Sequence, residues 1–177
     1  MNALQFDRGT AVPAALVFCM MFLAVPARAD SRPRLSSGET VYVSVYSTVY
    51  SGPRKSPFQL AAMLSIRNTD PGYPITIMSA DYYDNNGTLV DRYIGEQLTL
   101  GPLASTHFYI KEYDKRGGPG ANFLVKWRSA HAVNQPVIEG IMLGLASGQG
   151  VSFICPGRII TEHGRQSAGP DSAGRAR

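Results

Sequence analysis

The sequence predicts an all-β fold, an antiparallel immunoglobulin-like β-sandwich of about 7–9 short strands. In most segments, apolar and polar residues alternate with the period of two that is typical of half-buried strands. Turn residues recur about every 8–12 residues, and prolines lie between or at the edges of the alternating segments. No window has the length and the 3.6-residue period of an amphipathic helix.

The first expected strand, residues 40–50, alternates valines with other side chains. Tyr42, Tyr46 and Tyr50 share the face opposite the valines. An exposed row of tyrosines can stack on sugars or hold a protein partner. Tyrosine also favours ordinary strands, where it packs across the sheet. These three residues are therefore candidate binding residues, with simple cross-strand packing as the alternative.

The later strands follow the same alternation. Residues 122–129 place Trp127 on one face with Phe123 and Val125, so we expect Trp127 to be a main core residue. Cys155 is the one cysteine outside the N-terminal segment, and we expect it to fill the core as an apolar side chain. Further strands are expected at residues 58–67, 75–84, 88–94, 104–113, 137–145 and 150–160.

Two segments between these strands have the composition of turns. In residues 68–72, Asn and Asp side chains can bond nearby amides, Pro71 fixes φ, and Gly72 accepts positive φ. Residues 84–87 end in Asn-Gly, a strong hairpin signal, so Gly87 is expected to have positive φ.

Four polar or aromatic residues near these turns, Arg67, Asp81, Tyr82 and Tyr83, are not explained by turn chemistry. Arg67 and Asp81 are expected to form a charge pair between neighbouring strands. Tyr82 points to the opposite face from Asp81. The alternative is that Arg67, Asp81 and Tyr82 form a binding site.

The N-terminus resembles a secretory signal peptide. An apolar run follows Arg8, and small residues at positions 27 and 29 predict cleavage after Ala29. Residues 1–29 are thus expected to be removed and the protein to be periplasmic or otherwise exported, with no stable membrane span left after cleavage. An uncleaved anchor and a lipoprotein lipidated at Cys19 are the alternatives. We expect the sandwich domain at residues 38–161 and a disordered tail at residues 162–177.

The composition argues against several activities. Basic residues are scattered and the formal net charge is only +4, so no nucleic acid partner is expected. The three histidines lack metal-site spacing, Gly-x-Ser-x-Gly is absent, and no catalytic residue, metal or cofactor is predicted. A glycan-active envelope hydrolase remains the alternative, because paired carboxylates could converge in a cleft. The candidate carboxylates are Asp81, Glu96, Glu112, Asp114 and Glu139.

Several segments together resemble a known family. "VYVSVYSTVYSG", "LSIRNTDPGYPITIMSADYYDNNGTLV", "LTLGPLAST", "GGPGANFLVKW" and "GQGVSFICPGRII" are similar, in order and spacing, to a bacterial family of exported proteins, domain of unknown function 3124. The resemblance covers about residues 41–160. It implies export and the extent of the domain, and it implies no activity.

Taken together, the sequence favours a non-enzymatic binding or structural module of the bacterial cell envelope. The expected partner is an envelope protein or an envelope glycan.

Overall fold

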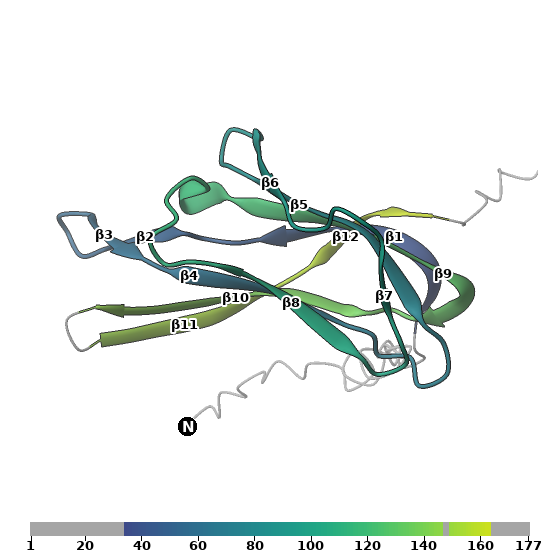
Figure 1. Ribbon diagram of the computed structural model, residues 1–177. Helices are drawn as coiled ribbons and strands as arrows, with labels where there is room; N and C mark the ends of the chain where they lie inside the picture. Colours follow the sequence, from purple (N-terminus) through teal and green to yellow (C-terminus); the bar gives the residue numbers. More distant parts are fainter. Residues whose placement is uncertain (1–33, 147–148, 164–177) are drawn as a thin grey trace, which may run out of the picture. The chain divides into compact units, whose positions relative to one another are not determined.

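The computed structural model describes residues 34–146 and 149–163 (Figure 1). These residues form twelve strands and one 3-10 turn (Gly118–Gly120), without an α-helix, so the all-β prediction is confirmed. The strand pairings are antiparallel. The strands are β1 (Leu35–Ser44), β2 (Thr48–Ser51), β3 (Ser56–Gln59), β4 (Ala61–Arg67), β5 (Ile75–Tyr83), β6 (Leu89–Arg92), β7 (Leu98–Leu100), β8 (Ser105–Ile110), β9 (Asn122–Asn134), β10 (Val137–Ala146), β11 (Gln149–Pro156) and β12 (Arg158–Glu162).

Two larger sheets share one hydrophobic core. The six-stranded sheet has the order β12-β1-β9-β5-β6, with β7 paired to β5. The four-stranded sheet has the order β11-β10-β4-β8, and β2 and β3 form a separate hairpin. In Figure 1 the four-stranded sheet lies below the six-stranded one, and buried side chains from both contribute to a single cluster.

The core follows the alternation in the sequence. Phe123, Val125 and Trp127 on β9 are all buried, which confirms the prediction for Trp127. Leu64 and Ile66 of β4, in the other sheet, belong to the same cluster. Burial of these side chains is the main stabilising term for such a domain. Among the described residues, no helix has the length and apolarity needed to span a bilayer.

The expected strand at residues 40–50 is divided into two. The backbone N–H of Val45 donates to Ala121 O at 3.0 Å, and that of Ser47 donates to Gly118 O at 3.2 Å. These hydrogen bonds join residues 45 and 47 to the segment that precedes β9. β1 therefore ends at Ser44, and β2 begins in another sheet. Such divisions, together with the unpredicted strand β7, explain why the described residues contain more strands than the sequence predicted.

The chain changes sheets between β11 and β12. Gly157 lies at the crossing, and its N–H donates to Ile138 O at 2.8 Å. A β-carbon at this position would lie 2.6 Å from that oxygen, so only glycine fits the close approach. As a result, β11 forms an edge of the four-stranded sheet, and β12 forms an edge of the six-stranded sheet.

The ordered strands extend beyond the predicted domain of residues 38–161. β1 begins at Leu35, and Glu162, which was assigned to a disordered tail, belongs to β12 and forms an ion pair with Arg34. The N–H of His163 donates to Gly38 O at 2.8 Å. The start of the tail at residue 162 is therefore corrected. The remainder of the predicted tail, and the predicted signal peptide, lie outside the described residues.

The two predicted turns have the expected side-chain hydrogen bonds, but Gly72, unlike Gly87, does not adopt positive φ. Between β5 and β6, the Asp84 carboxylate accepts hydrogen bonds from the N–H groups of Asn86 and Thr88, each at 2.8 Å. Gly87 has a φ of 79°, which confirms the prediction of a left-handed conformation. Between β4 and β5, Asn68 and Asp70 are buried and bond the surrounding backbone.

Candidate functional site

The three tyrosines predicted as an exposed row do not form one surface. Tyr42 lies on β1 and is half-buried, whereas Tyr50 lies on β2 and is 60% exposed. Tyr46, between these strands, packs against Phe153 with ring centroids 5.7 Å apart. Because the strand divides at Ser44, the three side chains lack a common platform.

The expected pair between Arg67 and Asp81 is wrong. Arg67 lies on β4 in the four-stranded sheet, and Asp81 lies on β5 in the six-stranded sheet. Asp81 is instead opposite Arg92 on β6, with 4.0 Å between the Asp81 Oδ1 and Arg92 Nε atoms. The alternation of side chains had placed both residues on strand faces without indicating which strands are neighbours.

Tyr82 is fully buried and so is not available to a partner at the surface. Its ring lies 5.0 Å from that of Phe123 and 6.4 Å from that of Tyr93. Burial, and secondarily the negative charge of Asp114, raises the pKa of Tyr82 to about 12. The described residues offer its hydroxyl no hydrogen-bond partner.

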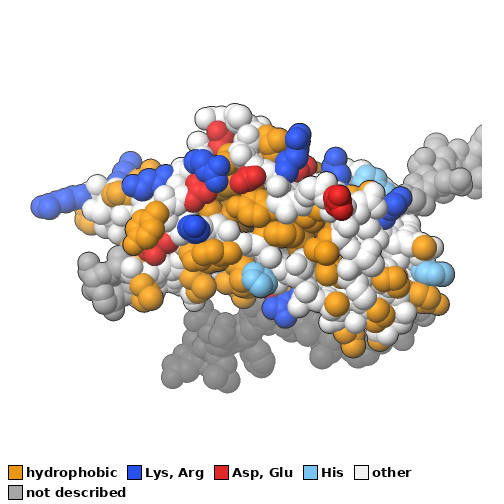
Figure 2. Space-filling model, in the orientation of Figure 1, with side chains coloured by type: hydrophobic (Ala, Val, Ile, Leu, Met, Phe, Trp, Pro, Cys, Tyr) orange, Lys and Arg blue, Asp and Glu red, His pale blue; other side chains and the backbone are white. Residues whose placement is uncertain are grey.

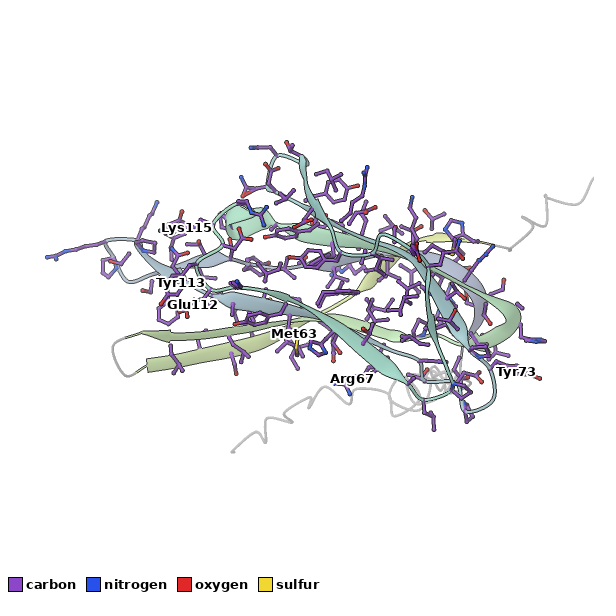
Figure 3. All side chains as sticks on the ribbon, in the orientation of Figure 1. Met63, Arg67, Tyr73, Glu112, Tyr113 and Lys115 are labelled. Atoms are coloured by element: carbon purple, nitrogen blue, oxygen red, sulfur yellow. The ribbon has the colours of Figure 1, made fainter. Side chains whose placement is uncertain are left out.

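An apolar row crosses the outer face of the four-stranded sheet, and sequence reasoning missed it. The strand register aligns Ile154, Ile141, Met63 and Tyr109 on β11, β10, β4 and β8. Ile154 is 56% exposed and Tyr109 is 54% exposed. Figure 3 labels Met63 between Arg67 on one side and Glu112 and Tyr113 on the other. Apolar side chains that are neighbours on an exposed surface can mark an interaction site.

Next to this row lies a cavity of about 540 Å³, which we name the apolar pocket. Leu143 and Leu145 project from β10, and Leu145 is 79% exposed. Glu112 is the one charged residue in the lining; it is half-buried, and no ion pair or hydrogen bond of its side chain occurs among the described residues. The lining residues are Ala61, Tyr109, Glu112, Leu143, Gly144, Leu145, Gly150, Val151 and Ser152.

A second cavity of about 440 Å³, the tyrosine pocket, shares Tyr109 with the first. Arg116 contributes to its lining and is held by Asp114 at 2.7 Å and by Asp91 at 3.8 Å. The hydrogen bond from Arg116 lowers the pKa of Asp114, which therefore stays ionised. Figure 2 shows charged side chains beside apolar ones at the end of the molecule where Figure 3 labels Tyr113. The lining residues are Tyr93, Tyr109, Ile110, Lys111, Tyr113, Asp114 and Arg116.

The end of β8 and the segment that follows it contribute side chains to both pockets. Tyr109 of β8 lines both, Glu112 lines the apolar pocket, and Tyr113 lines the tyrosine pocket. Tyr113 is 82% exposed. Exposed tyrosines beside an arginine, around an apolar centre, are the side chains most enriched at protein interfaces.

Two carboxylates share a third, smaller pocket. Glu39 and Glu139 both line a cavity of about 220 Å³ near the crossing from β11 to β12. Glu39 is buried, and its carboxylate accepts a hydrogen bond from the Gln135 side-chain amide. The other predicted carboxylates do not join them in this lining. Within the described ranges, no cluster of His, Cys, Asp and Glu side chains could hold a metal ion.

Comparisons with known proteins agree with the resemblance found in the sequence. The model of a family described as protein of unknown function (DUF3124) matches residues 38–160. No curated protein matches the chain. Among solved structures, the chain is similar to the crystal structure of Thermotoga maritima 1070, with 12% identity and a TM-score of 0.42. That match covers 68% of this chain and 92% of the other.

Proposed function

We propose that the chain, which belongs to DUF3124, a family of proteins of unknown function, is an exported, non-enzymatic binding module of the bacterial envelope. Its binding surface comprises the apolar pocket and the tyrosine pocket on either side of Tyr109. Its partner is an envelope protein. The immunoglobulin-like class of sandwich is part of this proposal, supported by two antiparallel sheets around one core.

The chemistry of the apolar pocket favours a protein over a glycan. Leu143 and Leu145 are exposed aliphatic side chains, and a sugar gains little from them because it binds through stacking on aromatic faces and through hydrogen bonds. A partner's aliphatic side chain would bury them from water, at about 25 cal/mol per Å² of apolar surface.

The negative charge of Glu112 indicates which side chains the partner should contribute. The half-buried Glu112 carboxylate lies in the wall of the apolar pocket and is not neutralised by a described residue. A lysine or arginine of the partner would form a partly desolvated ion pair there, which is worth more than an exposed one. The single observation that carries the proposal is therefore a carboxylate without a partner among the described residues, in a pocket lined otherwise by uncharged side chains.

Selection from a displayed peptide library tests this surface directly. The probe is the library itself, selected on the wild-type mature chain and counter-selected on Leu143→Asp. We expect enriched peptides that combine an aliphatic residue with a lysine or arginine, and at least about tenfold weaker binding to Glu112→Lys, since an ion pair becomes a repulsion. Glu96→Lys, which makes the same change at an exposed position outside both pockets, should bind normally.

The native partner is then sought with a photo-crosslinker at Tyr109, with the exposed Tyr50 as the control position. Crosslinking to one protein at Tyr109, lost in Glu112→Lys, supports the proposal. Enrichment without basic residues, or binding of peptidoglycan fragments at Tyr109 that leaves peptides unable to compete, contradicts it.

One observation favours a second candidate function, a glycan-active hydrolase. Glu39 and Glu139 line the same cavity, and glycoside hydrolysis uses two carboxylates. Release of soluble fragments from purified peptidoglycan by the wild type, abolished in both Glu39→Gln and Glu139→Gln, would establish it. Equal background release by all three proteins would exclude this pair.

A further inference from the structure

The free edge of β11 differs from the other described sheet edges. β11 has eight residues, Gln149–Pro156, and none is charged. β12 and β6 are shorter than β11 and carry charged residues. β8, with six residues, is also shorter than β11. Natural sheets protect their edges with charges, with short strands or with a covering segment. No described strand pairs with the outer side of β11, so its backbone groups on that side lack ladder partners.

From this edge we infer that β11 pairs antiparallel with β11 of a second copy of the chain, which joins the two four-stranded sheets into one continuous sheet. Gly150, Val151 and Ser152 of this edge also line the apolar pocket, but the pairing uses the backbone groups of β11 and does not rest on the proposed docking of a partner. Pairing about a two-fold axis uses the same edge of both copies, so the assembly closes as a dimer.

The residues of β11 fit this pairing when Ser152 lies on the axis. Directly opposite residues must then point to the same face, and Gly150 of one copy faces Ile154 of the other on the outer face. On the inner face, Val151 faces Phe153. Each bulky side chain thus meets a smaller one, and no like charges are opposed.

The pairing would cover apolar surface that the single chain leaves exposed. Val151 is 36% exposed although it points to the inner face, because the sheet ends beside it. The paired edge is about 23 Å long at 3.3 Å per residue, so the interface is smaller than a standard one of about 800 Å² per partner. The dimer is therefore expected to dissociate on dilution.

Sedimentation of the purified mature chain tests the inference. Between about 1 µM and about 1 mM, the wild type should shift reversibly from monomer to dimer. Ser152→Lys places two positive charges on the axis and should weaken the dimer at least about tenfold. The control is Ser105→Lys, an exposed serine on the outer face of β8, the opposite edge of the same sheet. This control should dimerise as the wild type does.

A crosslinking experiment keeps the test independent of any loss of folding. In a Cys155→Ser background, Ser152→Cys should form a disulfide-linked dimer on mild oxidation, because opposite β-carbons in an antiparallel pair lie within about 5.5 Å. Ser105→Cys should remain monomeric. Three outcomes would overturn the inference. The wild type could stay monomeric at the highest concentration, the Ser152→Lys variant could dimerise with unchanged affinity, or the crosslink could form at residue 105 instead of residue 152. Because Ser152 lines the same pocket as Glu112, the peptide selection uses no substitution on β11, and sedimentation of the chain alone involves no peptide; the two proposals are therefore tested separately.

Discussion

The carboxylate of Asp70 accepts a hydrogen bond from the backbone N–H of Asn134, with 2.9 Å between the Oδ2 and N atoms. Its other oxygen accepts from the N–H groups of Gly72 and Tyr73, each at 2.9 Å. Asp70 lies between β4 and β5, and Asn134 ends β9. One buried carboxylate therefore ties the connection between the two sheets to the start of the β9–β10 turn.

Asp70→Asn should lower the melting temperature of the protein. An amide has one oxygen, so at least one of the three backbone donors would lose its acceptor and face an NH₂ group. Asp84→Asn is the matched control, because Asp84 makes the same type of turn at an exposed site. Thermal unfolding followed by circular dichroism measures both variants, and an equal effect would contradict a special role for Asp70.

The stability of the wild type should also fall in acid through Asp70. The hydrogen bond from Asn134, followed by that from Gly72, lowers the pKa of Asp70 below its ordinary value of 3.8. A lowered pKa in the folded state contributes stability above the unfolded-state pKa and loses it as the pH falls through the folded-state pKa. Melting temperatures between about pH 6 and pH 2 should therefore fall less steeply in Asp70→Asn than in the wild type.

Trp127→Ala should destabilise the protein by about 3–5 kcal/mol, the usual cost of truncating a large buried aromatic. Trp127 is 1% exposed and is the only tryptophan, so circular dichroism must replace fluorescence in the denaturant titration. Tyr50→Ala, at an exposed position, should stay within about 0.5 kcal/mol of the wild type. A Trp127→Ala variant as stable as that control would show that the side chain is not a core residue.

The strands of the core could be predicted from the sequence, because burial on one face imposes a period of two. Phe123, Val125 and Trp127 show this directly. The pairing of Arg67 with Asp81 failed because alternation assigns a face to each residue but contains no information on sheet order. Sheet order depends on long-range contacts, such as that of Asp70 with Asn134.

The candidate site could not be predicted from the sequence, because it also depends on the order of strands in the sheet. Glu112 was recognised only as one carboxylate among several, and Leu143 only as part of a strand. The two line one pocket because β10 pairs with β4, and β4 with β8. Tyr109 and Tyr113 are exposed and line these pockets, but the regular spacing in the sequence had pointed to Tyr42, Tyr46 and Tyr50, which do not lie on one strand.

Cleavage after Ala29 should occur when the full chain is expressed in a bacterium. Small residues at positions 27 and 29 follow an apolar run of signal-peptide length. Mass spectrometry of the periplasmic fraction should find a mature chain that begins at Asp30, and Ala29→Asp should block its release. A protein that keeps Met1, or one lipidated at Cys19, would refute the prediction.

Tyr82→Phe should leave stability unchanged at neutral pH or raise it by up to about 1 kcal/mol, because the buried hydroxyl has no described partner to lose. Tyr82→Ala is the contrasting variant and should cost about 3–5 kcal/mol, since it removes the ring that packs on Phe123. Denaturant titration followed by circular dichroism separates the two. Peptide binding at the apolar pocket should be normal in Tyr82→Phe.

The loss of stability at alkaline pH is a second measurement that distinguishes Tyr82→Phe from the wild type. Burial raises the pKa of Tyr82 from its ordinary value of 10.0 to about 12, so the folded state holds its proton more tightly than the unfolded state. A raised pKa contributes stability below the unfolded-state value and loses it as the pH rises toward the folded-state value. The wild type should therefore lose stability between pH 10 and pH 12, and Tyr82→Phe should lose less, with the remainder due to other tyrosines such as Tyr93, whose pKa burial also raises. Identical alkaline profiles would place the Tyr82 hydroxyl in contact with water and restore it as a residue that a ligand can reach.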